Sequence, residues 1–172
     1  ALPRRGKKQT VSFRLDVAVG ELDLVSHERY DVRPTYVIYG GLIFIPLTQD
    51  YLMSWGENWY NNAPKHLVAL QKYGRRTIEN EQVVVLSKVL PAEVNKGYHD
   101  YRDLRILEVN GQPIFHIREL IRRIEDAAQR TFVEFKTDQG ILIVLNRQLV
   151  EKADPKILKT YSVPNARSED LR

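Results

Sequence analysis

The 172-residue chain contains no cysteine, one methionine and two tryptophans. The lack of cysteine excludes disulfide bonds, thiol catalysis and cysteine-based zinc sites, although it identifies no compartment. The longest uncharged apolar stretch, Tyr36 to Leu47, contains Pro46 and is shorter than the roughly 20 residues that a membrane-spanning helix needs, so no membrane contact is expected. No signal-peptide pattern opens the chain. Its start at Ala1 leads us to expect a processed or excised part of a longer protein.

Positive charge is concentrated at one end of the chain. The sequence has 26 Lys and Arg against 22 Asp and Glu, a formal net charge of +4. No acidic residue occurs before Asp16, and four of the basic residues lie in the first eight positions: Arg4, Arg5, Lys7 and Lys8. The rest of the chain therefore carries 22 basic and 22 acidic side chains and is neutral. Because no aromatic residues interleave these charges, the pattern favours a solvated arm over a nucleic-acid partner, which we keep as a further alternative.

Short apolar segments predict a chain with more strand than helix. Strands are expected where apolar and polar residues alternate, or where apolar runs lie between turn residues: 10–19, 36–39, 42–45, 83–90, 106–109, 132–136 and 141–145. The apolar share of 43% is sufficient for a folded core. The expected fold class is therefore α+β, mostly β.

Three helices are predicted from spacing and capping residues. An amphipathic stripe indicates a helix over about 116–128: Ile117, Leu120, Ile121 and Ile124. A second helix is expected over 64–73, with Gly74 as its C-terminal capping glycine. A third is expected over about 154–161, because Asp154 can serve as an N-cap and Pro155 as the first helical residue.

Few residues could support catalysis or metal binding. None of the six serines has the flanking glycines that would place backbone N–H groups beside a nucleophilic hydroxyl. The only local group that could hold a cation is His99 with Asp100 and Asp103, and a solvated loop explains it better. Gly40-Gly41 lacks the residues that complete a phosphate-binding loop. We expect no catalytic residue, no metal and no cofactor.

The segment from Tyr39 to Phe44 is the strongest candidate for a binding function. A Gly-Gly turn that leads into an apolar strand can bind the carboxylate of a peptide C-terminus through backbone N–H groups, while the strand pairs with the peptide. The helix over 116–128 would form the other wall, although the same stripe must also supply core side chains. An ordinary glycine turn explains this hexapeptide equally well.

Longer blocks of the sequence resemble a known family. Gly-Gly-Leu-Ile-Phe at 40–44 is similar to the carboxylate-binding loop of PDZ domains. The wider pattern resembles the distal, second PDZ-like domain of Deg/HtrA-type serine proteases. The blocks that carry this resemblance are YVIYGGLIFIPLT at 36–48, VVVLSKVLPAEVNKGY at 83–98, ILEVNGQPI at 106–114 and ILKTYSVPNARSEDL at 157–171.

The resemblance implies a PDZ-like fold and a domain organisation. The fold would be a partly open β-barrel or sandwich capped by helices, in the permuted arrangement of bacterial-type proteases. Residues 36–172 would form this domain, with an insertion at about 51–82, and residues 1–35 would be the basic arm, a strand and a linker from a preceding domain. The catalytic module would lie upstream of this chain. The compartment would be the periplasm for a bacterial protein, and an organelle or the nucleus for a plant-like one.

The resemblance also implies a function. The chain would be a non-catalytic module of a serine endopeptidase that assists oligomer assembly and regulation through β-augmentation. Its partners would be peptide or protein segments, chiefly other subunits of the same protease. The alternative is an adaptor that captures substrate C-termini. The residues expected to bind a peptide are Tyr39, Gly40, Gly41, Leu42, Ile43, Phe44, Ile117, Leu120 and Ile121.

Pro46 departs from an ordinary peptide-binding strand. Proline has no N–H to donate, so a peptide paired with the strand over 42–47 would lose one bond of the ladder. The segment from Tyr51 to Tyr60 follows directly and could lie over the groove. We therefore expect the groove to be closed, or occupied by a segment of a partner subunit, rather than open to free substrates.

Overall fold

The computed structural model describes residues 2–4, 7–9, 22–27, 31–126 and 128–172. Within the basic arm, β1 (Leu2–Arg4) pairs with β2 (Lys7–Gln9) as an antiparallel hairpin. The strand predicted over 10–19 lies outside the described residues and stays a prediction.

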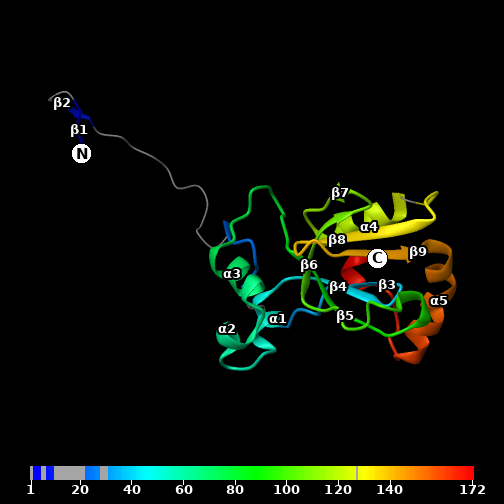
Figure 1. Ribbon diagram of the computed structural model, residues 1–172. Helices are drawn as coiled ribbons and strands as arrows, with labels where there is room; N and C mark the ends of the chain where they lie inside the picture. The colour runs from blue at the N-terminus through cyan, green and yellow to red at the C-terminus, as the bar shows by residue number, and fades with distance from the viewer. Residues whose placement is uncertain (1, 5–6, 10–21, 28–30, 127) are drawn as a thin grey trace.

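The body of the molecule is an open antiparallel sheet (Figure 1). Its strand order is β3-β4-β5-β6-β8-β9, with β7 paired to β6. The strands are β3 (Val37–Tyr39), β4 (Leu42–Pro46), β5 (Val84–Val89), β6 (Leu104–Val109), β7 (Gln112–Pro113), β8 (Phe132–Thr137) and β9 (Leu142–Asn146). The α+β prediction is confirmed, and the expected strands within the described ranges are present to within two residues of their predicted ends.

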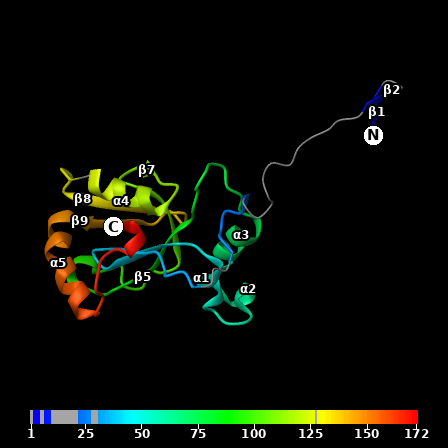
Figure 2. The same cartoon turned by 180° about the vertical axis from the view of Figure 1, so that it is seen from behind.

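Helices lie at both ends of the sheet and over one face. α1 (Gln49–Met53), α2 (Trp59–Asn62) and α3 (Lys65–Tyr73) gather at one end, and α5 (Arg147–Thr160) lies at the other, as the opposite views of Figures 1 and 2 agree. α4 (Ile117–Asp126) packs against β4 and β6. Two short 3-10 turns, η2 (Glu93–Asn95) and η3 (Glu169–Leu171), complete the described elements. None of the helices in the described ranges is long and apolar enough to cross a membrane.

The buried side chains form two main clusters that share β5. Val84 and Leu86 point into the larger cluster, which lies between the sheet and α4. Val85 points the other way, into a second cluster with Leu52 and Leu67 of α1 and α3. β5 is thus buried on both faces, which explains why its sequence is an apolar run rather than an alternation.

The second cluster also includes residues from the segment before the sheet. Leu24 and Val25 are almost fully buried against α1 and α3. The Leu24 N–H donates to the Gly74 carbonyl over 3.2 Å. The described part of this segment, 22–27, therefore packs on the body. The assignment of residues 1–35 to a preceding domain stays a prediction.

The last helix begins earlier than predicted. α5 starts at Arg147, where the Asn146 side chain accepts the Leu149 N–H over 3.1 Å, and Pro155 lies inside the helix. We predicted that the Asp-Pro pair starts the helix. The helix tolerates Pro155 in its interior because this residue is exposed and removes only one backbone hydrogen bond. The predicted boundary at 154 was wrong.

The end of α3 is as predicted, but the reason was wrong. Gly74 has φ −66°, so it is not a left-handed capping residue. A Cβ at this position would lie 2.3 Å from the Leu70 carbonyl oxygen and 3.0 Å from the Leu24 side chain. Glycine is required here by close packing of the chain, not by its backbone angles.

Candidate functional site

The candidate loop is the tight turn of the β3–β4 hairpin. Tyr39 and Leu42 are direct partners across the two strands, so Gly40 and Gly41 form a two-residue connection. Their φ angles are 57° and 81°. This is the geometry of a type I′ turn, which favours glycine at both central positions and matches the twist of the flanking strands.

The turn already holds a carboxylate. The Gly40 N–H donates to Oδ1 of Asp154, a residue of α5, over 2.9 Å. Burial raises the pKa of Asp154 from 3.8 to about 6, while the hydrogen bond from Gly40 acts in the opposite direction. The anion-binding capacity predicted for this turn is therefore used within the chain at Gly40. Sequence reasoning missed this role, because it placed Asp154 at a helix start instead of facing the turn.

A buried asparagine fixes the other side of the turn. Asn95 is fully buried, and its side-chain amide nitrogen donates to the carbonyls of Gly40 (2.7 Å) and Leu90 (2.8 Å). Its amide oxygen accepts the Ala92 N–H over 2.9 Å. A Cβ on Gly41 would lie 2.5 Å from this amide and 2.6 Å from the Leu90 carbonyl oxygen. The turn is thus held from both sides and leaves no room for a side chain.

Neither edge of β4 is open beside the turn. β5 pairs along its whole length, and β3 pairs with Leu42, Ile43 and Phe44 on the opposite edge. β-Augmentation needs an unpaired strand edge. The expectation that an incoming peptide pairs with β4 over these three residues was therefore wrong, because β3 occupies that position. The chain's own β3 covers this edge, and the expectation that the groove is closed or holds a partner subunit's segment stays a prediction.

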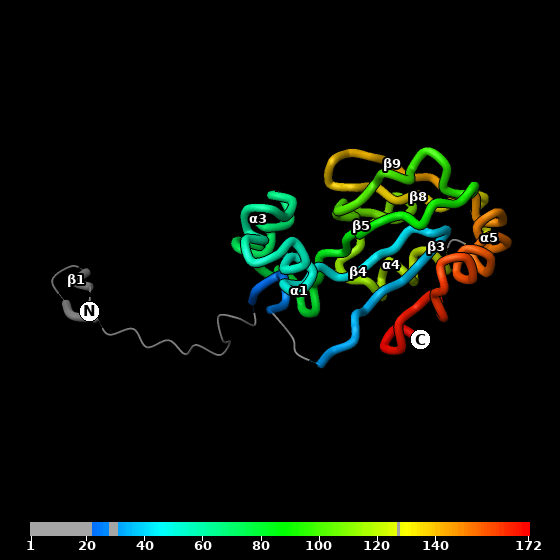
Figure 3. The backbone as a smooth tube through the Cα atoms, turned by 90° about the horizontal axis from the view of Figure 1, so that it is seen from below, coloured from blue at the N-terminus to red at the C-terminus, as the bar shows by residue number. Residues whose placement is uncertain are grey.

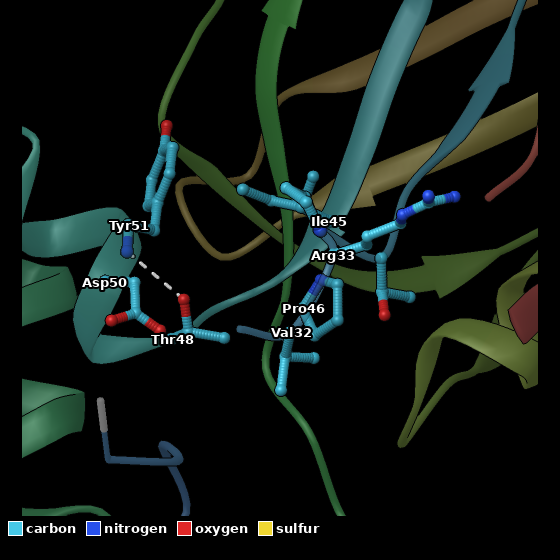
Figure 4. Close-up of a pocket in the computed structure, with 9 residues that line it drawn as sticks. Val32, Arg33, Ile45, Pro46, Thr48, Asp50 and Tyr51 are labelled. Atoms are coloured by element: carbon cyan, nitrogen blue, oxygen red, sulfur yellow. Dashed lines mark hydrogen bonds between the residues drawn. The ribbon is translucent and has the colours of Figure 1, made fainter. Parts of the chain in front are cut away.

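Pairing between β3 and β4 ends where Pro46 would have to donate. The Leu47 N–H donates to the Val83 carbonyl on the β5 side, so the alternation of the strand directs position 46 toward β3. Beyond this point β4 and α1 face a cavity of about 390 Å³. Figure 4 shows Asp50 and Tyr51 of α1 on one side of it and Ile45 with Pro46 across.

The outer edge of β3 is paired with the end of the chain. The Ile38 N–H donates to the Ala166 carbonyl (2.7 Å), and the Ser168 N–H donates to the Tyr36 carbonyl (3.0 Å). Val37 and Arg167 are antiparallel partners between these two bonds. Figure 3 shows the C-terminal segment running beside β3. The end of the chain thus pairs with β3 as an added strand would, and the binding of partner segments by strand addition stays a prediction.

The predicted helix residues contribute to the core. Ile117, Leu120 and Ile121 are at most 7% exposed. They share the larger cluster with Leu42 and Phe44, so the structure does bring these five predicted residues together. Their side chains are buried among one another. The prediction that they bind a peptide stays untested, and any peptide would have to displace packed core residues.

The two remaining predicted side chains lie on opposite faces of the hairpin. Tyr39 is half-buried against Phe135, with ring centroids 6.1 Å apart, and burial raises its pKa to about 12. Ile43 points to the other face, where it packs on a small cluster with Ile38, Leu90 and Ile157. The predicted groove positions from Tyr39 onward therefore do not share one surface.

The candidate cation site has other contacts. The Asp103 side chain accepts the Tyr51 hydroxyl over 2.5 Å, and the His99 ring contacts the Ala92 carbonyl over 3.1 Å. Burial and the bond to Asp103 both raise the pKa of Tyr51. Across the described ranges, no group of three or more metal-binding side chains is found.

Comparison with known proteins identifies the family of this arrangement. The PDZ domain profile matches residues 25–170. The chain is 34% identical over 139 residues to protease Do-like 2, chloroplastic, of Arabidopsis thaliana, covering 81% of this chain and 22% of that protein. It is 29% identical over 149 residues to protease Do-like 4, mitochondrial, of the same plant, covering 87% and 26%.

A more distant relative extends the comparison beyond plants. The chain is 24% identical over 180 aligned positions to the serine protease DegP homolog of Plasmodium falciparum, covering 84% of this chain and 20% of that protein. The chain therefore spans about a fifth to a quarter of the length of these proteases, and it matches a part of each. The match over most of the chain, together with the open antiparallel sheet and its flanking helices, shows that the chain belongs to the PDZ domain family.

Proposed function

We propose that this chain is the non-catalytic distal PDZ module of a Deg/HtrA-type serine endopeptidase, and that it serves oligomer assembly and regulation. The PDZ family implies binding of protein or peptide segments. The relatives are named as proteases, and the chain matches only about a quarter of their length. A part of this size, matched by the PDZ domain profile, fits a module that acts on the protease through contacts.

One observation carries the choice of assembly over capture of free substrate C-termini. The Gly40–Gly41 turn binds Asp154, and the β4 edge beside it is paired with β3. A substrate C-terminus would have to displace both a half-buried carboxylate and a strand of the same domain. A contact between subunits does not need that turn, because it can use the surfaces outside it.

The proposal is tested on the intact chain by two measurements. Light scattering over a concentration series should give a mass that rises above 20.0 kDa as subunits associate. Titration with labelled peptides that end in an apolar residue and a free carboxylate should give no saturable binding that differs from the amidated forms of the same peptides.

Two opposite results would favour the adaptor. One is a monomer at every concentration together with peptide binding that requires the free carboxylate. The other is that Asn95→Ala or Gly41→Ala abolishes this carboxylate-dependent peptide binding. Gly111→Ala is the matched control. Gly111 also has a positive φ, 73°, but a Cβ there would meet no atom within 4 Å. The control therefore reports the backbone effect alone.

A further inference from the structure

We infer that the face formed by β3 and α4 is a peptide-binding site, and that its ligand is an extended segment with two acidic residues followed by leucine. In this chain the site is occupied by the tail, residues 164–172. The inference goes beyond the proposed function, because it holds whether or not the chain assembles into oligomers.

The tail contacts the body as a ligand would. Its backbone adds a strand to β3 through the bonds at Ile38 and Tyr36. The Ser168 hydroxyl accepts the Tyr36 N–H over 3.1 Å, which extends the pairing by a side chain. Main-chain bonds of this kind provide affinity without regard to sequence, so selectivity must come from the side chains.

Charged groups from two elements recognise the acidic pair. Arg33, just before β3, donates to both carboxylate oxygens of Glu169 over 3.1 Å. The Thr35 hydroxyl donates to Asp170 over 2.7 Å, and the Arg118 guanidinium of α4 donates to the Asp170 carbonyl. Burial acts to raise the pKa of Asp170, but the bonds from hydroxyls and the charge of Arg118 outweigh it and lower the pKa. These contacts favour an acidic sequence over a neutral or basic one at the same positions.

Leu171 is the apolar anchor of the tail. It is 5% exposed and belongs to the larger core cluster, which includes the inner face of α4. Among residues 164–172 only Leu171 and Ser168 are buried. Docking of the tail therefore depends on one large side chain, a few backbone bonds and exposed ion pairs, a set small enough to open without unfolding the body.

The connection to α5 and the space beneath the tail also suit release. Ser162, just past the helix end, has φ 54°, a conformation that a non-glycine residue adopts at a cost. A cavity of about 570 Å³ lies between the tail and the segment 32–36. The tail is thus held by a strained connection over an incompletely filled space.

The first test uses amide exchange in the unmodified chain. The Ile38 and Ser168 amides bond across the tail contact, whereas the Leu47 amide bonds within the sheet to Val83. If the tail is a ligand, the first two should exchange at least tenfold faster than Leu47. Equal rates for all three would show that the tail opens only when the domain unfolds, and would overturn the inference.

The second test frees the site in the full-length chain. The Leu171→Asp variant removes the anchor, and a labelled peptide of residues 163–172 is added in trans. The variant should bind this peptide at least tenfold tighter than the parent chain, whose own tail competes at high effective concentration. Leu149→Asp is the matched control, because Leu149 is 55% exposed on α5, and it should behave as the parent does.

Selectivity and location are tested by three further comparisons. The peptide should lose at least tenfold affinity when it carries the Leu171→Asp substitution itself. Arg118→Gln in the variant chain should weaken binding, whereas Arg122→Gln should not, because Arg122 lies on the same helix and pairs with Glu119. Since the chain has no cysteine, a Val37→Cys, Arg167→Cys pair can lock the tail, and oxidation should abolish binding in trans. The inference would be overturned if binding were unchanged by the Leu171→Asp substitution in the peptide, by Arg118→Gln in the chain or by oxidation of the cysteine pair.

Discussion

A single carboxylate decides how the Gly40–Gly41 turn is used. Asp154 accepts the N–H of Gly40 from within the helix α5, at the position where a peptide terminus was expected. The Asp154 side chain is half-buried, so its charged form loses hydration. The one hydrogen bond from Gly40 compensates for only part of this loss. The pKa of Asp154 is therefore about 6, above its ordinary value of 3.8.

This residue should make stability depend on pH. Between about pH 4 and pH 6 the folded chain retains the Asp154 proton while the unfolded chain has lost it, so stability falls as the pH rises through this window. Asp154→Asn keeps an acceptor for Gly40 and carries no charge. It should remove this fall and raise the free energy of unfolding at pH 7.5 by on the order of 1 kcal/mol, a value reduced for partial exposure.

Urea unfolding at pH 4 and pH 7.5 measures this effect. Asp138→Asn, at an exposed hairpin turn, is the control for loss of a carboxylate alone. An Asp154→Asn variant that is less stable than the parent at pH 7.5 would show that the Gly40 contact favours the charged form.

At the scale of elements, the sequence predicted strands better than it predicted their neighbours. Alternation and apolar runs located β3, β4, β5, β6, β8 and β9, because the pattern of a strand is local. The partners of β3 were not predictable in the same way. The bond between Ile38 and Ala166 joins residues far apart in the chain, and nothing in either segment's composition specifies it. The edge of β4 that we expected to receive a peptide is therefore covered by β3, a neighbour that the sequence did not predict.

The missed start of α5 has a related cause. Pro155 was read as the first helical residue because proline is favoured there, whereas here it lies inside the helix. The Asn146 cap is the signal that could have placed the start correctly, since Asn is a preferred N-cap and its side chain accepts the Leu149 N–H.

Pro155 should therefore reduce the stability of α5. Pro155→Ala would restore one backbone bond and should raise the free energy of unfolding by roughly 1–3 kcal/mol, because an interior proline costs about 3 kcal/mol and its restriction of the unfolded chain offsets part of that. Thermal or urea unfolding of the variant measures this, with Lys156→Ala as an exposed control on the same helix. A destabilised variant would instead indicate that Pro155 is needed to direct Asp154 at Gly40.

At the scale of the whole molecule, each outer edge of the described sheet is contacted by another part of the chain. The tail covers β3, and at β9 the Tyr98 hydroxyl accepts the Val144 N–H over 3.2 Å. Exposed strand edges tend to pair with other chains. Contacts between subunits are therefore expected at side chains or through an exchanged tail, rather than by addition to a bare edge.

The charge distribution gives the last prediction. Removing residues 1–8 takes four basic residues and no acidic one, so the net charge falls from +4 to zero. The three buried clusters of the described residues begin at Leu24, and the deletion should change the free energy of unfolding by less than about 0.5 kcal/mol.

Any salt-sensitive retention of the chain on a duplex-DNA or heparin column should disappear on this deletion, because such retention requires clustered positive charge. Replacing Arg122 and Arg123 by Gln lowers the charge by two within the body and should leave retention unchanged. Retention that survives the deletion but not this replacement would place a polyanion-binding surface on α4, and the arm would then have no part in it.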